Sequence, residues 1–426
     1  MKKNYLAKKL TAALLAGTMV LSMGGMTAFA DKTEPGSGES EVTTIQPDNG
    51  YIPLQKRLYS SSTSANYLKV PATSFTYNIR SARSEECADL TIKGVTYSVT
   101  PGDADAVGLV QNKGDAFATN GVTIAFDGDE TFAKPGDSDR YYVDETAGAY
   151  IQLKEGEFDA PGIYRYVISE DTTNFIDGIT AETNQYYLDV YVENNTAQDA
   201  ETDYIIGAVV AYTNLESGVP TGKSDKVLFE NLYTTYQLKV TKAVTGNQGY
   251  AGGDYTFSID VNNAATGDDN FTVLVYPSAT VPTPTVYYKS STNNTIPENG
   301  VNLHDTGYIV ILGLAKKDTY AVRELVAGQD GYTTTYYEGI SDITSTSGVA
   351  AEDKHVVNAG QTEDLYEITR VSTDTEIEDD REFLVQNDRG SISPTGIAMT
   401  FAPYALMVVF AGGLAALFLR KKKEDF

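Results

Sequence analysis

Residues 52–58 read IPLQKRL, and residues 238–244 read LKVTKAV. Successive side chains of a β-strand point to opposite faces, so every second residue shares a face. As strands, both stretches place a lysine, Lys56 or Lys242, on a face that is otherwise apolar. The neighbours on these faces are Ile52, Leu54 and Leu58 in the first stretch and Leu238, Val240 and Val244 in the second. Each stretch therefore predicts a strand whose lysine points into a hydrophobic core.

These two stretches open two similar units, so the sequence contains an internal repeat. Each unit continues with an aromatic strand, a strand that ends in glutamate and a strand that ends in asparagine. The segments are 74–77, 164–170 and 227–231 in the first unit and 254–257, 320–324 and 383–387 in the second. The repeat predicts two domains, over residues 51–235 and 236–390.

Alternation also directs the acids and amides inward, because Glu170, Glu324, Asn231 and Asn387 each share a strand face with apolar residues. A buried ammonium must pair or lose its proton, and a buried carboxyl tends to keep its own. In such a cluster the neutral amine can attack the asparagine carbonyl while the acid polarises that carbonyl and shuttles protons, and ammonia leaves. The sequence therefore predicts two isopeptide bonds, Lys56–Asn231 and Lys242–Asn387, promoted by Glu170 and Glu324.

Each of these residues also has a simpler interpretation. A strand lysine usually extends along the surface, and a glutamate or asparagine at a strand end usually forms a turn. The same residue types, in the same order and with matching alternation in both units, favour the cross-link. Two nearby lysines fit less well, because Lys239 lies on the opposite face from Leu238 and Lys69 has no counterpart in the second unit.

The rest of the interior is a series of short strand patterns. Alternating runs at residues 94–99, 164–168, 186–192 and 204–210 are separated by Gly and Asp-Gly turns. No run between the two ends of the chain has helical periodicity. The pattern is typical of an all-β protein, here two tandem immunoglobulin-like β-sandwich domains.

The N-terminal end has the pattern of a secretory signal peptide over residues 1–30. Four lysines at positions 2, 3, 8 and 9 precede an apolar stretch, and Ala28-Phe29-Ala30 is a small-x-small cleavage site. The mature chain is expected to begin near Asp31. Residues 31–50, rich in Gly, Ser, Glu and Pro, predict a flexible leader.

Residues 391–426 have the layout of a sortase sorting signal. The apolar run at 397–419 is long enough to cross a hydrocarbon core of about 30 Å as a helix, and a basic cluster follows at 420–423. Just upstream, a Pro-Thr-Gly element predicts cleavage by a sortase between Thr395 and Gly396. The motif residues are Ile392, Ser393, Pro394, Thr395 and Gly396. A permanent membrane anchor is the alternative interpretation.

Composition disfavours several function classes. The chain carries 32 basic and 58 acidic residues, and the net charge of −26 repels nucleic acid. Cys87 is the only cysteine, so no internal disulfide can form. Neither histidine lies near a plausible nucleophile, and we expect no hydrolase site, cofactor or metal. Acidic turns at 103–105 and 127–130 do not fit an EF-hand loop, and 218–224 departs from the spacing of a phosphate loop.

Over essentially its whole length, the chain resembles the streptococcal-type major (backbone) pilins of Gram-positive bacteria, whose domains form isopeptide bonds. The resemblance rests on residues 162–170, 177–180, 188–192, 238–246, 331–335, 393–396 and 402–404. It places the family's lysine, glutamate and asparagine on Lys56, Glu170 and Asn231 and on Lys242, Glu324 and Asn387. The motif departs at Ser393, where relatives more often carry an aliphatic residue, and this leaves the sortase class open.

The resemblance implies a structural subunit of a pilus rather than an enzyme. In such pilins a sortase joins the C-terminal threonine of one subunit to a lysine of the next, shortly before the asparagine of the N-terminal domain. Lys226 and Lys223 occupy that stretch, and Lys226 is preferred because its alternation is opposite to that of Asn231.

The implied location is the cell surface, on a pilus that is anchored to the cell wall after a transient stay in the membrane. The implied partners are a sortase, other copies of the chain, minor pilins, peptidoglycan and host receptors. Two alternatives stay open: a wall-anchored adhesin or minor pilin, and a secreted sugar-binding or hydrolytic protein.

Overall fold

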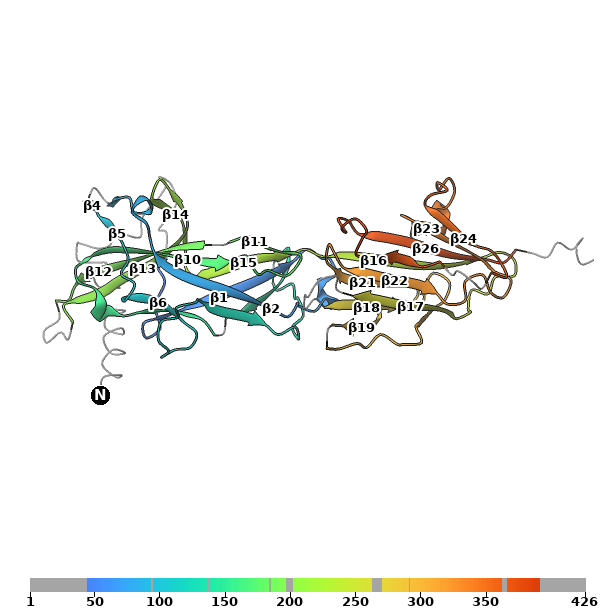
Figure 1. Cartoon of the computed structure of the whole chain (residues 1–426), viewed down its shortest axis with the longest axis horizontal. Coiled ribbons are helices and arrows are strands. Elements are labelled where there is room, and N and C mark those ends of the chain that lie inside the picture. Colours follow the sequence, from blue (N-terminus) through green and yellow to red (C-terminus); the bar gives the residue numbers. More distant parts are fainter. Residues whose placement is uncertain are drawn as a thin grey trace, which may run out of the picture.

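The computed structural model describes residues 44–390 except for 93–94, 137, 147, 184, 197–201, 263–269, 291 and 362–365. These residues form β-strands and short 3-10 helices, with no α-helix among them. Two β-rich units lie end to end and are joined between β15 and β16 (Figure 1). We refer to β1–β15 as domain 1 and to β16–β26 as domain 2. The all-β prediction is confirmed.

Domain 1 has two main sheets and a small hairpin. The first sheet has the order β11-β15-β1-β9-β6, with β8 also pairing β1, and the second has the order β14-β13-β12-β10-β2-β7, with β5 pairing β10. The hairpin is β3-β4. The strands are β1 (Tyr51–Ser60), β2 (Thr73–Ser81), β3 (Leu90–Ile92), β4 (Val95–Tyr97), β5 (Val99–Pro101), β6 (Val107–Val110), β7 (Val122–Phe126), β8 (Tyr141–Glu145), β9 (Tyr150–Leu153), β10 (Gly162–Asp171), β11 (Ile179–Ala181), β12 (Gln185–Asn194), β13 (Tyr204–Glu216), β14 (Val219–Ser224) and β15 (Val227–Tyr233). The 3-10 helices are η2 (Ala65–Tyr67), η3 (Ser84–Glu86) and η4 (Glu155–Glu157).

Domain 2 is built in the same way from two sheets. One has the order β19-β18-β21-β16-β26-β23-β24, and the other has the order β20-β17-β22-β25. The strands are β16 (Tyr236–Thr245), β17 (Tyr255–Asn262), β18 (Phe271–Tyr276), β19 (Thr285–Lys289), β20 (Val301–Leu303), β21 (Tyr308–Leu314), β22 (Thr319–Glu324), β23 (Thr333–Glu338), β24 (Lys354–Val357), β25 (Ile368–Arg370) and β26 (Arg381–Asp388). A 3-10 helix, η5 (Ile343–Ser345), follows β23.

Strand β1 shows how alternation builds the sandwich. Its residues alternate strictly between half-exposed and buried positions from Tyr51 to Ser60. Lys56 is among the buried residues of β1, and Lys242 of β16 is equally inaccessible to solvent. Since a strand has a period of two, a lysine in phase with apolar neighbours is carried into the core with them.

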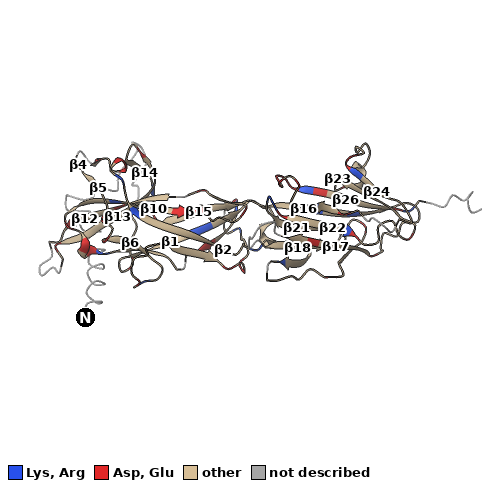
Figure 2. Cartoon of the chain, viewed as in Figure 1, with Lys and Arg blue, Asp and Glu red and all other residues tan. Residues whose placement is uncertain are grey.

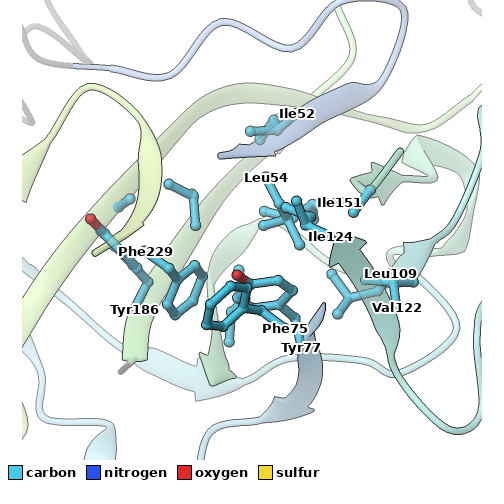
Figure 3. Close-up of a cluster of buried hydrophobic side chains, with 14 of the residues drawn as sticks. Ile52, Leu54, Phe75, Tyr77, Leu109, Val122, Ile124, Ile151, Tyr186 and Phe229 are labelled. Carbon is cyan, nitrogen blue, oxygen red and sulfur yellow. The ribbon is translucent and has the colours of Figure 1, made fainter. Parts of the chain in front are cut away.

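The core of domain 1 lies between its two main sheets and is rich in aromatic rings. Figure 3 shows Phe75 and Tyr77 in the same cluster as Tyr186 and Phe229. The Phe229 ring centroid lies 4.7 Å from that of Tyr77 and 5.2 Å from that of Tyr186. Strands from both sheets therefore meet at one aromatic layer.

The two domains make a direct junction. Its apolar part includes three buried domain 2 residues that join the core of domain 1: Leu274, Val310 and Leu312. Two buried polar side chains of β18 and its approach also reach domain 1. Asn270 Nδ2 donates to Val70 O at 2.7 Å, and the Thr272 hydroxyl donates to Tyr67 O at 3.0 Å. The junction therefore adds packed and hydrogen-bonded contacts to the covalent connector between β15 and β16.

The described chain begins inside the segment expected to be a flexible leader. Ile45 is buried in the core of domain 1, and its N–H donates to Val209 O at 2.9 Å. Its apolar side chain explains the difference, because burial removes it from water. The predicted signal peptide and the whole of 391–426 lie outside the described residues. Within the described part, no helix is long and apolar enough to cross a membrane.

Candidate cross-linking sites

The same strand pairing brings lysine and asparagine together in each domain. The first strand pairs in parallel with the last, β1 with β15 and β16 with β26. The residue two places after the lysine, Leu58 in domain 1 and Val244 in domain 2, lies opposite the asparagine, Asn231 or Asn387. Lysine and asparagine are therefore diagonal neighbours on adjacent strands, at the same offset in both domains.

The glutamates come from the facing sheet of each sandwich. Glu170 of β10 lies opposite Tyr77 of β2, and Glu324 of β22 lies opposite Phe257 of β17. Charged residues are spread over both domains (Figure 2), but these two carboxylates point inward and are buried. Each crosses the core and meets the lysine of the other sheet.

In domain 1 the acid contacts the amine but not the amide. Lys56 Nζ lies 2.5 Å from Glu170 Oε1, and the Tyr77 hydroxyl donates to the same oxygen at 3.0 Å. Asn231 is fully buried. Within the described residues, neither Asn231 Oδ1, Asn231 Nδ2 nor Glu170 Oε2 has a hydrogen-bond partner. Buried polar atoms without partners cost free energy, so burial of the unpaired Asn231 side chain destabilises this site.

In domain 2 all three groups are connected. Lys242 Nζ lies 2.9 Å from Glu324 Oε2, and Asn387 Nδ2 donates to Glu324 Oε1 at 2.6 Å. The Thr334 hydroxyl donates to Asn387 Oδ1 at 2.7 Å. The sequence led us to expect the acid at the asparagine carbonyl. The structure instead places Glu324 at the amide nitrogen and Thr334 at the carbonyl oxygen.

Burial makes both lysines easier to deprotonate. Loss of hydration lowers the pKa of Lys56 and that of Lys242 from 10.5 to about 8, against the opposing effect of the facing glutamate. Aromatic rings cover both amines, with Lys56 Nζ 4.0 Å from the Phe75 centroid and Lys242 Nζ 4.7 Å from the Tyr255 centroid. Loss of this proton leaves a nucleophilic amine, and the facing glutamate can take a proton from that amine during the attack and give one to the leaving nitrogen.

The other lysines considered from the sequence lie elsewhere. Lys239 is half-exposed, and Lys69 Nζ donates to Asp129 O, so neither joins a cluster. Lys223, expected in a turn, is an exposed residue of β14 opposite Tyr212. Lys226, expected to face solvent, is half-buried between β14 and β15. The sorting motif, Ile392 to Gly396, lies outside the described residues.

A further buried ion pair, outside both clusters, anchors the hairpin that carries Lys223. Arg165 Nε and Nη2 donate to the two carboxylate oxygens of Asp189 at 2.6 and 2.8 Å. Arg165 Nη1 donates to Gly218 O, in the turn between β13 and β14, at 2.7 Å. The segment with phosphate-loop-like spacing is thus one strand of a hairpin, held against the outer face of its sheet.

Tyr77 and Thr334 were missed by the sequence reasoning. Tyr77 lies in the aromatic segment 74–77, where alternation predicts a packed ring and says nothing about its hydroxyl. Thr334 lies in 331–335, which the sequence marks only as part of the family resemblance. Its role depends on the register of β23, which puts it opposite Asn387. A threonine in phase with the apolar residues of a strand beside the asparagine strand is the signal that could have found it.

Each of the two domains matches a model of a known domain family. Residues 104–234 match the family model described as Spy0128-like isopeptide containing domain, and residues 236–363 match a domain of unknown function, DUF7601. A pilin of Streptococcus pyogenes serotype M1 is 25% identical over 280 residues, which is 65% of this chain and 72% of that protein. The chain is a relative of streptococcal pilins. The predicted resemblance is confirmed.

Solved structures of major pilins align over a larger share of this chain. The major pilin T3.2 of Streptococcus pyogenes is 19% identical with a TM-score of 0.45, over 80% of this chain and 99% of that one. Another Streptococcus pyogenes major pilin is 18% identical with a TM-score of 0.45, again over 80% and 99%. The relationship to pilins therefore rests on the sequence matches.

Proposed function

We propose that this chain is the backbone subunit of a covalently polymerised surface pilus. One observation carries the proposal: a buried lysine, glutamate and asparagine cluster recurs at equivalent strand positions in two tandem domains of a pilin relative. Burying charges costs free energy, so buried charged clusters often mark functional sites. In a fibre subunit under tension, covalent cross-links formed at such sites would keep the domains folded when the fibre is pulled.

The clusters are proposed to form isopeptide bonds without an enzyme. In each domain the lysine Nζ attacks the asparagine Cγ, a new Cγ–Nζ bond forms and the Cγ–Nδ2 bond breaks. The glutamate takes a proton from the attacking amine and returns one to Nδ2, which leaves as ammonia. The distances favour this, since Glu324 already contacts both nitrogens in domain 2.

We propose that assembly joins the C-terminal sorting motif of one subunit to a lysine of domain 1 in the next subunit. A sortase would cleave between Thr395 and Gly396 and join Thr395 to Lys226 of the next subunit, with Lys223 as the other candidate. Lys223 is the more exposed of the two and sits on the anchored hairpin. Other pilin subunits, adhesins, the sortase and peptidoglycan are the partners that this proposal requires.

The test is a boiled, reduced cell-wall extract probed for this chain. A backbone subunit should give a ladder of high-mass multimers, because sortase joins survive boiling. Lys226→Arg and Lys223→Arg, made singly and together, should identify the joining lysine by loss of the ladder. A single band in the unmodified strain would contradict a backbone role and favour a wall-anchored adhesin or minor pilin.

A further inference from the structure

Thr334 lies at the reacting end of the domain 2 cluster. It belongs to β23, directly opposite Asn387 of β26, and its side chain is fully buried. Its hydroxyl lies 2.7 Å from Asn387 Oδ1. This oxygen belongs to the carbonyl that Lys242 would attack.

A second hydrogen bond sets the direction of that hydroxyl. The backbone N–H of Gly328 donates to Thr334 Oγ1 at 3.0 Å. A backbone N–H can only donate, so Oγ1 accepts there and its own hydrogen is free to point at Asn387. The Asn387 amide is oriented in a similar way: a carboxylate oxygen can only accept, and Asn387 Nδ2 donates to Glu324 Oε1 on the other side. Thr334 is thus a donor aimed at Oδ1 by a fixed backbone group.

We propose that Thr334 is a catalytic residue of the domain 2 site, the donor that stabilises the oxyanion formed when Lys242 attacks Asn387. This rests on the proposed isopeptide function and deepens it. As Nζ bonds to Cγ, the carbonyl electron pair moves onto Oδ1, and the Thr334 hydrogen bond strengthens with the growing charge. When the tetrahedral intermediate collapses, the electron pair returns, the Cγ–Nδ2 bond breaks and ammonia leaves.

Two residues therefore divide the work in domain 2. Glu324 bridges the attacking and leaving nitrogens, Lys242 Nζ through Oε2 and Asn387 Nδ2 through Oε1. With both oxygens engaged by nitrogens, the carboxyl is not placed to polarise Oδ1. The Thr334 hydroxyl supplies that contact, so proton transfer and oxyanion stabilisation come from separate side chains.

Domain 1 has no hydroxyl at the equivalent position. There β11 pairs with the asparagine strand, and Ala181 lies opposite Asn231. Asn231 Oδ1 accordingly has no partner within the described chain. Domain 1 is therefore an internal reference for a cross-link formed without this donor.

The experiment follows ammonia loss over time in the full-length chain made by cell-free translation. Peptides that join Lys242 to Asn387, and Lys56 to Asn231, are quantified by mass spectrometry after digestion. We expect Thr334→Val to slow formation of the domain 2 cross-link on the order of 100-fold, the usual cost of removing one oxyanion donor. The domain 1 cross-link should form at its original rate.

Two variants separate the hydroxyl from packing. Thr334→Ser keeps the hydroxyl and should restore most of the rate, whereas Thr335→Val makes the same change at the next residue and should leave it unaltered. Folding is compared in a background that cannot cross-link, by thermal unfolding of Glu324→Ala with and without Thr334→Val. Thr334→Val that cross-links domain 2 at the original rate, or Thr334→Ser as slow as Thr334→Val, would overturn the proposal. Absence of both cross-links from the unmodified chain would instead overturn the isopeptide function itself.

Discussion

The two domains hold the same three residue types in the same strand register, yet they surround them differently. In domain 1 a tyrosine hydroxyl binds the acid, and no group in the described structure hydrogen-bonds to the asparagine side chain. In domain 2 the equivalent of Tyr77 is Phe257, and a threonine binds the asparagine oxygen. The lysine, glutamate and asparagine are the shared minimum. A hydroxyl donates to the acid in domain 1 and to the amide oxygen in domain 2.

This difference teaches which part of each site is preorganised. Tyr77 and Lys56 both contact Glu170, so the acid and amine of domain 1 are ordered, whereas no hydrogen bond orients the Asn231 side chain within the described residues. In domain 2 Glu324 already spans both nitrogens. We therefore expect the unlinked clusters to differ in rate although they form the same product.

Removal of the glutamates should have the largest effect. Glu170→Gln or Glu324→Gln keeps the side-chain volume but cannot shuttle protons, so the cross-link of that domain alone should fail. Each staple closes most of its domain, and its loss should lower the free energy of unfolding by about 5 kcal/mol if loop closure acts as it does for disulfides. Calorimetry and trypsin digestion measure this. Asn231→Ala and Asn387→Ala, which keep the ion pairs, are the matched controls and should lose stability similarly. Unchanged protease resistance in all four would contradict a structural role for the staples.

The next largest effect should appear when single pili are pulled, because the two staples are expected to have different mechanical roles. If Thr395 is joined to Lys226, force passes from Thr395 to Asn387, across the staple to Lys242, and back through the connector and β15. Nearly all of domain 1 lies off that path, because β15 alone links Lys226 to the connector. Asn387→Ala pili should therefore show unfolding extensions, whereas Asn231→Ala pili should stay close to the unmodified length. Equal extension in both would place the joining lysine elsewhere, near the mature N-terminus.

Cross-linking should depend on pH in the same way in both domains. The nucleophile is the neutral amine, and burial lowers the pKa of Lys56 and of Lys242 to about 8. Below that value the neutral fraction falls about tenfold per pH unit, so the rate should rise from pH 6 to 8 and level off above. Peptide mass spectrometry of refolding chains, sampled at each pH, gives both profiles at once. A rate that falls as the pH rises from 6 to 8 would contradict attack by a neutral lysine.

The smallest effect should come from Tyr77→Phe. This change removes one hydrogen bond to Glu170 and makes domain 1 resemble domain 2, where Phe257 stands at that place. A lost hydrogen bond to a buried acid corresponds to about 1.4 kcal/mol, so domain 1 should cross-link about tenfold more slowly. Domain 2 serves as the control in the same molecule. An unchanged domain 1 rate would show that Tyr77 only packs.

Much of this arrangement follows from the sequence because a strand has a period of two. Lys56, Glu170 and Asn231 are in phase with apolar neighbours, so their burial follows once strands are assumed, and the repeat supplies the same argument for domain 2. Tyr77 and Thr334 do not follow, because their roles depend on which strands become neighbours and in what register. Ile45 differs for a related reason: the composition of 31–50 suggests a leader, whereas one apolar residue is enough to pack its end onto the core.

The most direct test of the central claim is the intact mass of the mature protein, produced without residues 391–426 so that no sortase can polymerise it. Two isopeptide bonds predict a mass lower than that of the mature sequence by two ammonia molecules. Asn231→Ala and Asn387→Ala should each leave a deficit of one ammonia relative to their own sequences, and the double variant should have none. A mature protein with the full mass of its sequence would contradict the account.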